Sequence, residues 1–121
     1  MSQEMSFVEH RSGQRYEVSL PVRAEWDEAD TERHVFTEGV TQNIGPHGAL
    51  IHLQEMPSVG SRLRLAIMDP EAGPQEVEVL ARVLRLERNP SCSLAAIDLL
   101  EAEEKWRSTI WEAARSRADG N

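Results

Sequence analysis

The stretch RLRLAIMDPEAGPQEVEVLARVLRLE, residues 62–87, decides the fold class. Apolar residues alternate with other residues over 63–67 and again over 77–83. This period of two is typical of a strand that buries one of its faces. Between the two runs, residues 69–74 (DPEAGP) form a loop by their composition. The stretch therefore predicts two neighbouring strands joined by a short connection.

Comparable runs lie before and after this pair. They predict strands near residues 16–24, 33–43, 49–53 and 92–99. Six short strands joined by turns indicate a mainly β fold, a small antiparallel barrel or sandwich. Pro21 interrupts the first run and favours an edge strand or a bulge there. Residues 26–32 (WDEADTE) are expected to form an acidic, solvated hairpin loop.

The carboxy-terminal part of the chain follows a helical period. Four residues recur at helical spacing within 101–117: Trp106, Ile110, Ala113 and Arg117. We expect one helix that packs on the barrel. Trp111 lies well round this helix from Trp106, so either both indoles pack partly on the barrel or one of them faces a second surface.

Length and charge limit the function. A chain of 121 residues is most simply one domain. Its formal net charge of −8 argues against binding to DNA or RNA, since proteins bind these polyanions mainly by neutralising phosphates. A local basic cluster could still hold a small anion. Lys105 is the single lysine among 13 basic residues, and arginine is the side chain that forks onto phosphate and stacks on flat rings.

Other classes of protein find little support in the sequence. No apolar run approaches the ~20 residues that span a bilayer, so no membrane insertion is expected. The amino terminus lacks the features of a secretory signal, and the lone Cys92 suits a reducing compartment, which predicts a cytoplasmic protein. Neither a catalytic motif nor compact metal-ligand spacing occurs. We therefore expect no enzyme, no metal and no cofactor.

Two short elements offer ligand-binding chemistry. RSGQR, residues 11–15, supplies the guanidinium groups of Arg11 and Arg15 ahead of the first strand. NIGPHG, residues 43–48, is a glycine-containing turn whose backbone could approach a ligand closely. Together they indicate a receptor for a compact dianion that carries planar bases. Taken singly, the arginines could be solvated charges and the turn could be only a hairpin.

The order and surroundings of these elements resemble the PilZ domain family over about residues 9–100. The family carries R-x-x-x-R before the first strand and [D/N]-x-S-x-x-G after the second; here they stand as residues 11–15 and 43–48. The resemblance implies a six-stranded antiparallel β-barrel that binds cyclic di-GMP. Residues 1–15 would be a flexible segment, and residues 16–121 a single barrel domain with the carboxy-terminal helix.

The resemblance also implies a set of ligand-binding residues. They are Arg11, Arg15, Asn43, Gly45 and Gly48, with possible supporting contacts from His10, Gln42 and Arg82. Asn43 offers an amide donor and an acceptor to a guanine edge, and the amides of the two glycines are expected to be available to an oxyanion. Gly45 departs from the family pattern, which has serine there.

Two functional hypotheses follow. In the first, the protein is a receptor that binds cyclic di-GMP and relays the signal to a partner protein; the Arg11 and Arg15 pair favours it. In the second, it is a divergent interaction module that binds no nucleotide; Gly45 favours this one. Whether one ligand or a stacked pair would bind stays open.

Overall fold

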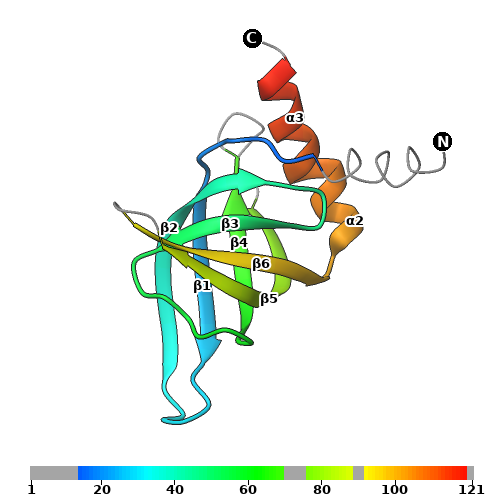
Figure 1. Cartoon of the computed structure of the whole chain (residues 1–121). Coiled ribbons are helices and arrows are strands. Elements are labelled where there is room, and N and C mark those ends of the chain that lie inside the picture. Colours follow the sequence, from blue (N-terminus) through cyan, green and yellow to red (C-terminus); the bar gives the residue numbers. More distant parts are fainter. Residues whose placement is uncertain (1–13, 70–75, 89–91, 120–121) are drawn as a thin grey trace, which may run out of the picture.

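The computed structural model describes residues 14–69, 76–88 and 92–119. Its six strands form a closed antiparallel barrel with a helical tail against it (Figure 1). The strands are β1 (Pro21–Asp27), β2 (His34–Ile44), β3 (Gly48–Leu53), β4 (Arg62–Met68), β5 (Glu76–Arg88) and β6 (Ser93–Glu101). Each strand pairs with two neighbours, in the order β1-β2-β3-β6-β5-β4, and β4 closes on β1. The predicted six-stranded barrel with a carboxy-terminal helix is confirmed.

Alternating side chains fill the barrel. In β4 every second residue from Leu63 to Ile67 is buried, and in β5 the same holds from Val77 to Val83. The register places Leu65 opposite Val79, so the buried residues of the two strands face the same interior. The alternation of residues 63–67 and 77–83 thus builds one wall of the core, as predicted.

The beginning of β1 differs from its prediction. The strand begins at Pro21, and Tyr16 makes only an isolated bridge to Ile44. Between them, the Thr41 side chain takes the place of a strand partner: its hydroxyl accepts the Leu20 N–H at 2.9 Å and donates to the Val18 carbonyl at 2.5 Å. These bonds hold the backbone outside a regular ladder. The predicted start of the strand at residue 16 is therefore wrong.

The edge-strand prediction for Pro21 is also wrong. β1 pairs with both β2 and β4, and no edge remains. Proline is tolerated because it is the first residue of the strand. At its other end β1 runs on to Asp27, so Trp26 is a buried strand residue and not part of the loop, which covers residues 28–33. Hydrogen bonds from Arg33 and Thr31 hold the pKa of the Glu28 carboxyl in this loop below its usual value.

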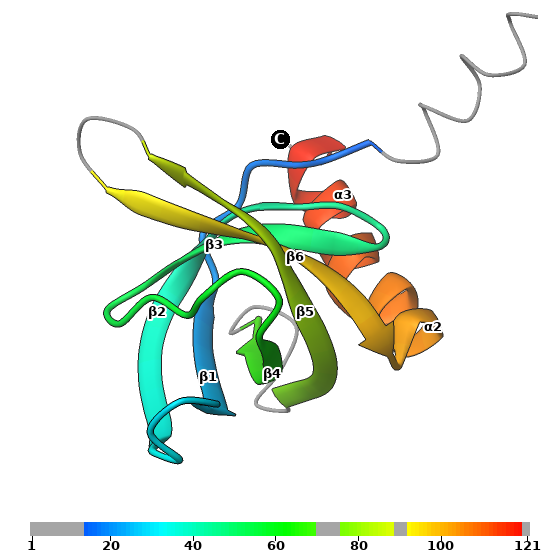
Figure 2. The same cartoon turned by 60° about the horizontal axis from the view of Figure 1, so that its bottom comes forward.

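The tail comprises α2 (Glu103–Trp106), a π-helical turn η1 (Arg107–Trp111) and α3 (Glu112–Asp119). Figure 1 shows it beside the chain that leads into β1, and Figure 2 shows it from a second side. Trp106, Ile110 and Ala114 are buried in the barrel core. Ala114 takes the place predicted for Ala113, because the wide turn puts an additional residue between the two α-helical parts.

The two indoles of the tail both pack on the barrel side. Trp106 is completely buried, and Trp111 is partly buried against the same core. Of the two arrangements left open by the sequence, the shared packing is the one found.

We predict that Thr41→Val destabilises the fold by about 1–3 kcal/mol. Valine has nearly the same shape, but it leaves the Leu20 N–H and the Val18 carbonyl without their partner. Thr41→Ser keeps the hydroxyl and is the matched control, with a loss of about 1 kcal/mol for the buried methyl group. Urea unfolding measures both; equal midpoints for Thr41→Val and the wild type would contradict the role given to the hydroxyl.

Candidate functional site

The two sequence elements meet on the outside of the barrel. Arg15 Nε donates a hydrogen bond of 2.7 Å to Asn43 Oδ1, across 28 residues of sequence. The rest of the side chain lies over Gly45: a Cβ placed there would be 2.9 Å from Arg15 Nη1 and 3.3 Å from its Cγ. Arg15 therefore touches both Asn43 and Gly45. Arg11 and His10 lie outside the described residues.

The backbone next to Arg15 holds it at the turn. Tyr16 N–H donates to the Ile44 carbonyl and Ile44 N–H donates to the Tyr16 carbonyl, both at 2.9 Å. This pair of bonds joins the residue after Arg15 to the residue after Asn43. The contact between the two elements thus has a backbone support that does not depend on the arginine side chain.

The glycines of the turn serve the fold. Gly45 N–H donates to the Gly48 carbonyl at 2.8 Å, and the Gly45 carbonyl accepts the indole N–H of Trp106 at 2.8 Å. The prediction that the Gly45 amide is available to an oxyanion is therefore wrong. At Gly48, a Cβ would lie 2.0 Å from the Ile97 carbonyl oxygen, so this position needs glycine for β3 to approach β6.

One row of paired residues leads from Asn43 around the barrel. Asn43 pairs with Leu50 of β3, Leu50 with Ala96 of β6, and Ala96 with Arg85 of β5. A register shift lies next to each end of the row, with Gln42 as the additional residue in β2 and Leu84 in β5. Such bulges bend a strand and redirect its side chains, and they are frequent beside active sites.

Arg85 is the residue of this region that the sequence did not single out. Its Nε and Nη2 atoms donate to Glu87 Oε2 at 3.0 and 2.5 Å. Burial lowers the pKa of Arg15, the positive charge of Arg85 lowers it further, and Glu87 opposes both effects. The positive charges of Arg15 and Arg85 thus repel each other on one outer face of the barrel. A bound anion would stabilise this arrangement. In the sequence, the signal for Arg85 was that Leu84 breaks the alternation of apolar residues in this strand.

The remaining candidates lie beside this row. Gln42 is exposed in the bulge next to Asn43. Arg82 is exposed in the neighbouring row, where it pairs with Asp98, which in turn pairs with Gly48. Within residues 14–69, 76–88 and 92–119, the Arg82 side chain forms no hydrogen bond or ion pair. The structure thus places Arg82 beside the row from Asn43 to Arg85, but no bond within these ranges connects Arg82 to Arg15.

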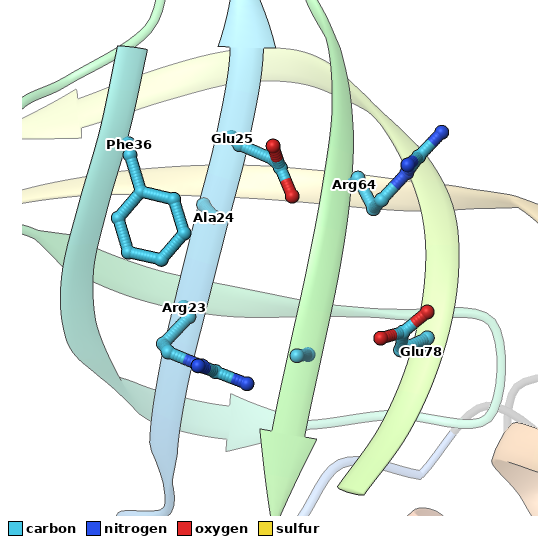
Figure 3. A pocket seen from close by; sticks show the side chains of 7 residues that line it. Arg23, Ala24, Glu25, Phe36, Arg64 and Glu78 are labelled. Carbon is cyan, nitrogen blue, oxygen red and sulfur yellow. The ribbon is translucent and has the colours of Figure 1, made fainter.

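A hollow on another face of the barrel is a weaker candidate. Figure 3 shows it between β1, β4 and β5, with Arg23, Glu25, Arg64 and Glu78 around it and Phe36 beside it. Arg23 is engaged with both carboxylate oxygens of Glu76, at 2.5 Å each. Because two arginines and two glutamates line the hollow, its charges balance and it does not select a dianion.

Comparison with known proteins agrees with this geometry. A family model, PilZ domain, matches residues 9–108. The chain belongs to the PilZ domain family. Both elements of the PilZ pattern fall within the matched range, and the structure brings their described residues into contact. A search of curated proteins finds no significant match.

Two solved structures share the PilZ fold. The Bacillus subtilis inhibitor of motility MotI (DgrA) superposes with a TM-score of 0.67 at 20% identity; the match covers 88% of this chain and 50% of that one. The chain thus spans half the length of MotI. The PilZ domain of Escherichia coli YcgR, solved with c-di-GMP, gives a TM-score of 0.62 at 15% identity and covers 88% of this chain and 95% of that domain.

In the part of the chain that the structure describes, no helix is long and apolar enough to cross a membrane. Among the same residues, no three His, Cys, Asp or Glu side chains gather as metal ligands would.

The two glycines of the PilZ turn should respond differently to alanine. We predict that Gly48→Ala destabilises the fold by about 3 kcal/mol, because the new methyl group meets the backbone of Ile97. Gly45→Ala should change stability by less than about 1 kcal/mol, since its Cβ meets only the flexible arginine side chain. Thermal and urea unfolding test the pair. A Gly45→Ala variant as unstable as Gly48→Ala would show that the turn, and not Arg15, fills this space.

Proposed function

We propose that this PilZ protein is a receptor for cyclic di-GMP that relays the signal to a partner protein. One observation carries the proposal: Arg15 lies on Asn43 and Gly45, so the two elements of the PilZ pattern form one site. The c-di-GMP in the YcgR structure supports the choice of ligand. The protein acts as a receptor and not as an enzyme, and we place it in the cytoplasm.

The geometry suits a ligand with two phosphates and two guanines. Arg15 uses its Nε for Asn43, which leaves both Nη groups to fork onto a phosphate or onto O6 and N7 of guanine. Arg85 brings a second guanidinium group from the other end of the row. Leu50 and Ala96 lie between the two ends and are apolar, as the neighbours of a flat base should be. Arg11 would add a third guanidinium group.

The response requires a second protein. Apart from the barrel and its tail, the described residues contain no element that could carry an output. The charge of −8 makes nucleic acid an unsuitable target. We therefore assign the output to a protein partner that recognises the nucleotide-bound surface.

A PilZ module that binds no nucleotide is the alternative function. The observation in its favour is that Arg15 already occupies the space above Gly45 and is already bound to Asn43. A ligand would have to compete with these contacts. The serine of the family pattern, which Gly45 replaces, would have added a hydroxyl group at the same place.

We predict that cyclic di-GMP binds the wild type and that Arg15→Ala weakens binding about 10- to 150-fold. This range follows from the roughly 1.5–3 kcal/mol of a hydrogen bond to a charged group. Arg64→Ala is the matched control, because it also removes one exposed arginine, from the hollow on the other face. Isothermal titration calorimetry measures all three proteins. A folded wild type that gives no binding heat would establish the module without nucleotide.

Gly45→Ser tests the departure from the family pattern. We predict that it keeps the affinity or raises it by up to about 12-fold, the value of one added hydrogen bond. The three atoms nearest the new Cβ all belong to the flexible Arg15 side chain, which can move at little cost. The same titration measures the change. Loss of binding in a folded Gly45→Ser protein would mean that the Arg15 side chain has to lie over Gly45 for the ligand to bind.

A further inference from the structure

We propose that Trp111 is a positioning residue of the nucleotide site and that its docking and nucleotide binding stabilise each other. This inference rests on the proposed function, because it concerns the same site. It assigns to the tail a role in binding, although the tail contributes none of the residues placed in the site above.

Trp111 holds both neighbours of Arg15. Its indole Nε1 donates to the Gln14 carbonyl at 3.1 Å, and its ring lies 6.2 Å from the ring of Tyr16, at an angle of 44°. Gln14 and Tyr16 directly flank Arg15. Trp111 therefore limits the directions in which the backbone can present the arginine to a ligand.

The tail also holds the other element of the site. Trp106 Nε1 donates to the Gly45 carbonyl at 2.8 Å in a buried position. His47, in the same turn, pairs through Nδ1 with the Glu103 carboxylate at the beginning of the tail. One helical segment thus touches the segment of Arg15 through Trp111 and the turn of Gly45 through Trp106.

The π-helical turn makes this double contact possible. Trp106 and Trp111 are five residues apart, and in an α-helix, at 100° per residue, they would point about 140° away from each other. η1 begins directly after Trp106 and ends at Trp111. At its end the Glu112 N–H donates to the carbonyl of Arg107, five residues earlier. The wide turn brings both indoles to the barrel side of the helix. Such single turns are rare and frequently lie at functional sites.

Hydroxyl groups support the wide turn. Thr109 Oγ1 donates to the Lys105 carbonyl at 2.5 Å and Ser108 Oγ to the same carbonyl at 3.2 Å. They satisfy a carbonyl whose usual helical geometry is disturbed. If η1 became α-helical, Trp111 would rotate away from Gln14 and Tyr16. An α-helical tail would thus be a second register, and in the register of the structure Trp111 holds the residues around Arg15.

Coupling follows from this choice of register. A nucleotide that fixes Arg15 favours the register in which Trp111 is docked, and a docked Trp111 favours the bound arrangement of Arg15. Such coupling is reciprocal, so each event strengthens the other by the same factor. Binding would then stabilise α3 in the docked register, and a partner could recognise the surface that α3 presents in this register.

Trp111→Phe tests the inference, because it keeps an aromatic ring against Tyr16 and removes the bond to Gln14. We expect it to weaken binding of cyclic di-GMP about 2- to 12-fold, the value of one hydrogen bond. Trp26→Phe is the matched control: Trp26 is buried in β1, away from the tail, so this variant should lose stability and keep the wild-type affinity. Calorimetry gives the affinities, and thermal unfolding confirms that each variant is folded.

Hydrogen exchange of the wild type gives an independent readout. Saturating cyclic di-GMP should slow amide exchange in residues 112–119, and Trp111→Phe should reduce this protection. A wild type that binds the nucleotide, together with an unchanged affinity for Trp111→Phe and no protection of 112–119, would overturn the coupling and leave the proposed function intact. A wild type that does not bind would overturn both.

Discussion

The buried indole of Trp106 is the contact on which the arrangement of this molecule depends. It joins the core and at the same time donates its N–H to the carbonyl of Gly45, in the hairpin turn between β2 and β3. A buried carbonyl without a partner is costly, so the turn and the tail are stable only together. The shape of this hairpin fixes the position of Asn43. The position of Asn43 then determines where the Arg15 side chain can bind. The site is thus built on a contact between the barrel and its tail, and not on a loop alone.

Irregularities in the barrel strands also position the side chains of the site. Two bulges, at Gln42 and Leu84, lie beside the ends of the row from Asn43 to Arg85. Each bulge shifts the alternation: in β2 the buried residues Thr41 and Ile44 are three positions apart, and in β5 no residue after Val83 is buried. The polar ends of the row can therefore be aimed outward without disturbing the core. This division allows the outer face to carry charge while the interior remains apolar.

The sequence predicted the barrel because the evidence for its strands is local: the apolar residues that alternate over 63–67 and 77–83 are the ones that the structure buries. It also predicted that Arg15, Asn43 and Gly45 belong together, since the family pattern carries information about contacts across 28 residues. The prediction from sequence failed where one side chain forms hydrogen bonds with a distant segment of the backbone. The hydroxyl of Thr41 ends the ladder before Pro21, and no local pattern near residues 16–20 indicates it. Arg85 was missed as well: Leu84 breaks the alternation, but only the pairing of β5 with β6 shows that the row from Asn43 ends at Arg85.

The closure of the barrel has a consequence for recognition. Each of the six strands has a neighbour on both sides, so the sheet has no free edge strand. A partner therefore finds no edge strand beside which to add a strand of its own, which is a frequent way for extended segments to bind. It must instead recognise side chains on the outer surface or on the tail. Surface residues can therefore be exchanged to suit a new partner while the hydrogen-bonded framework beneath them stays the same.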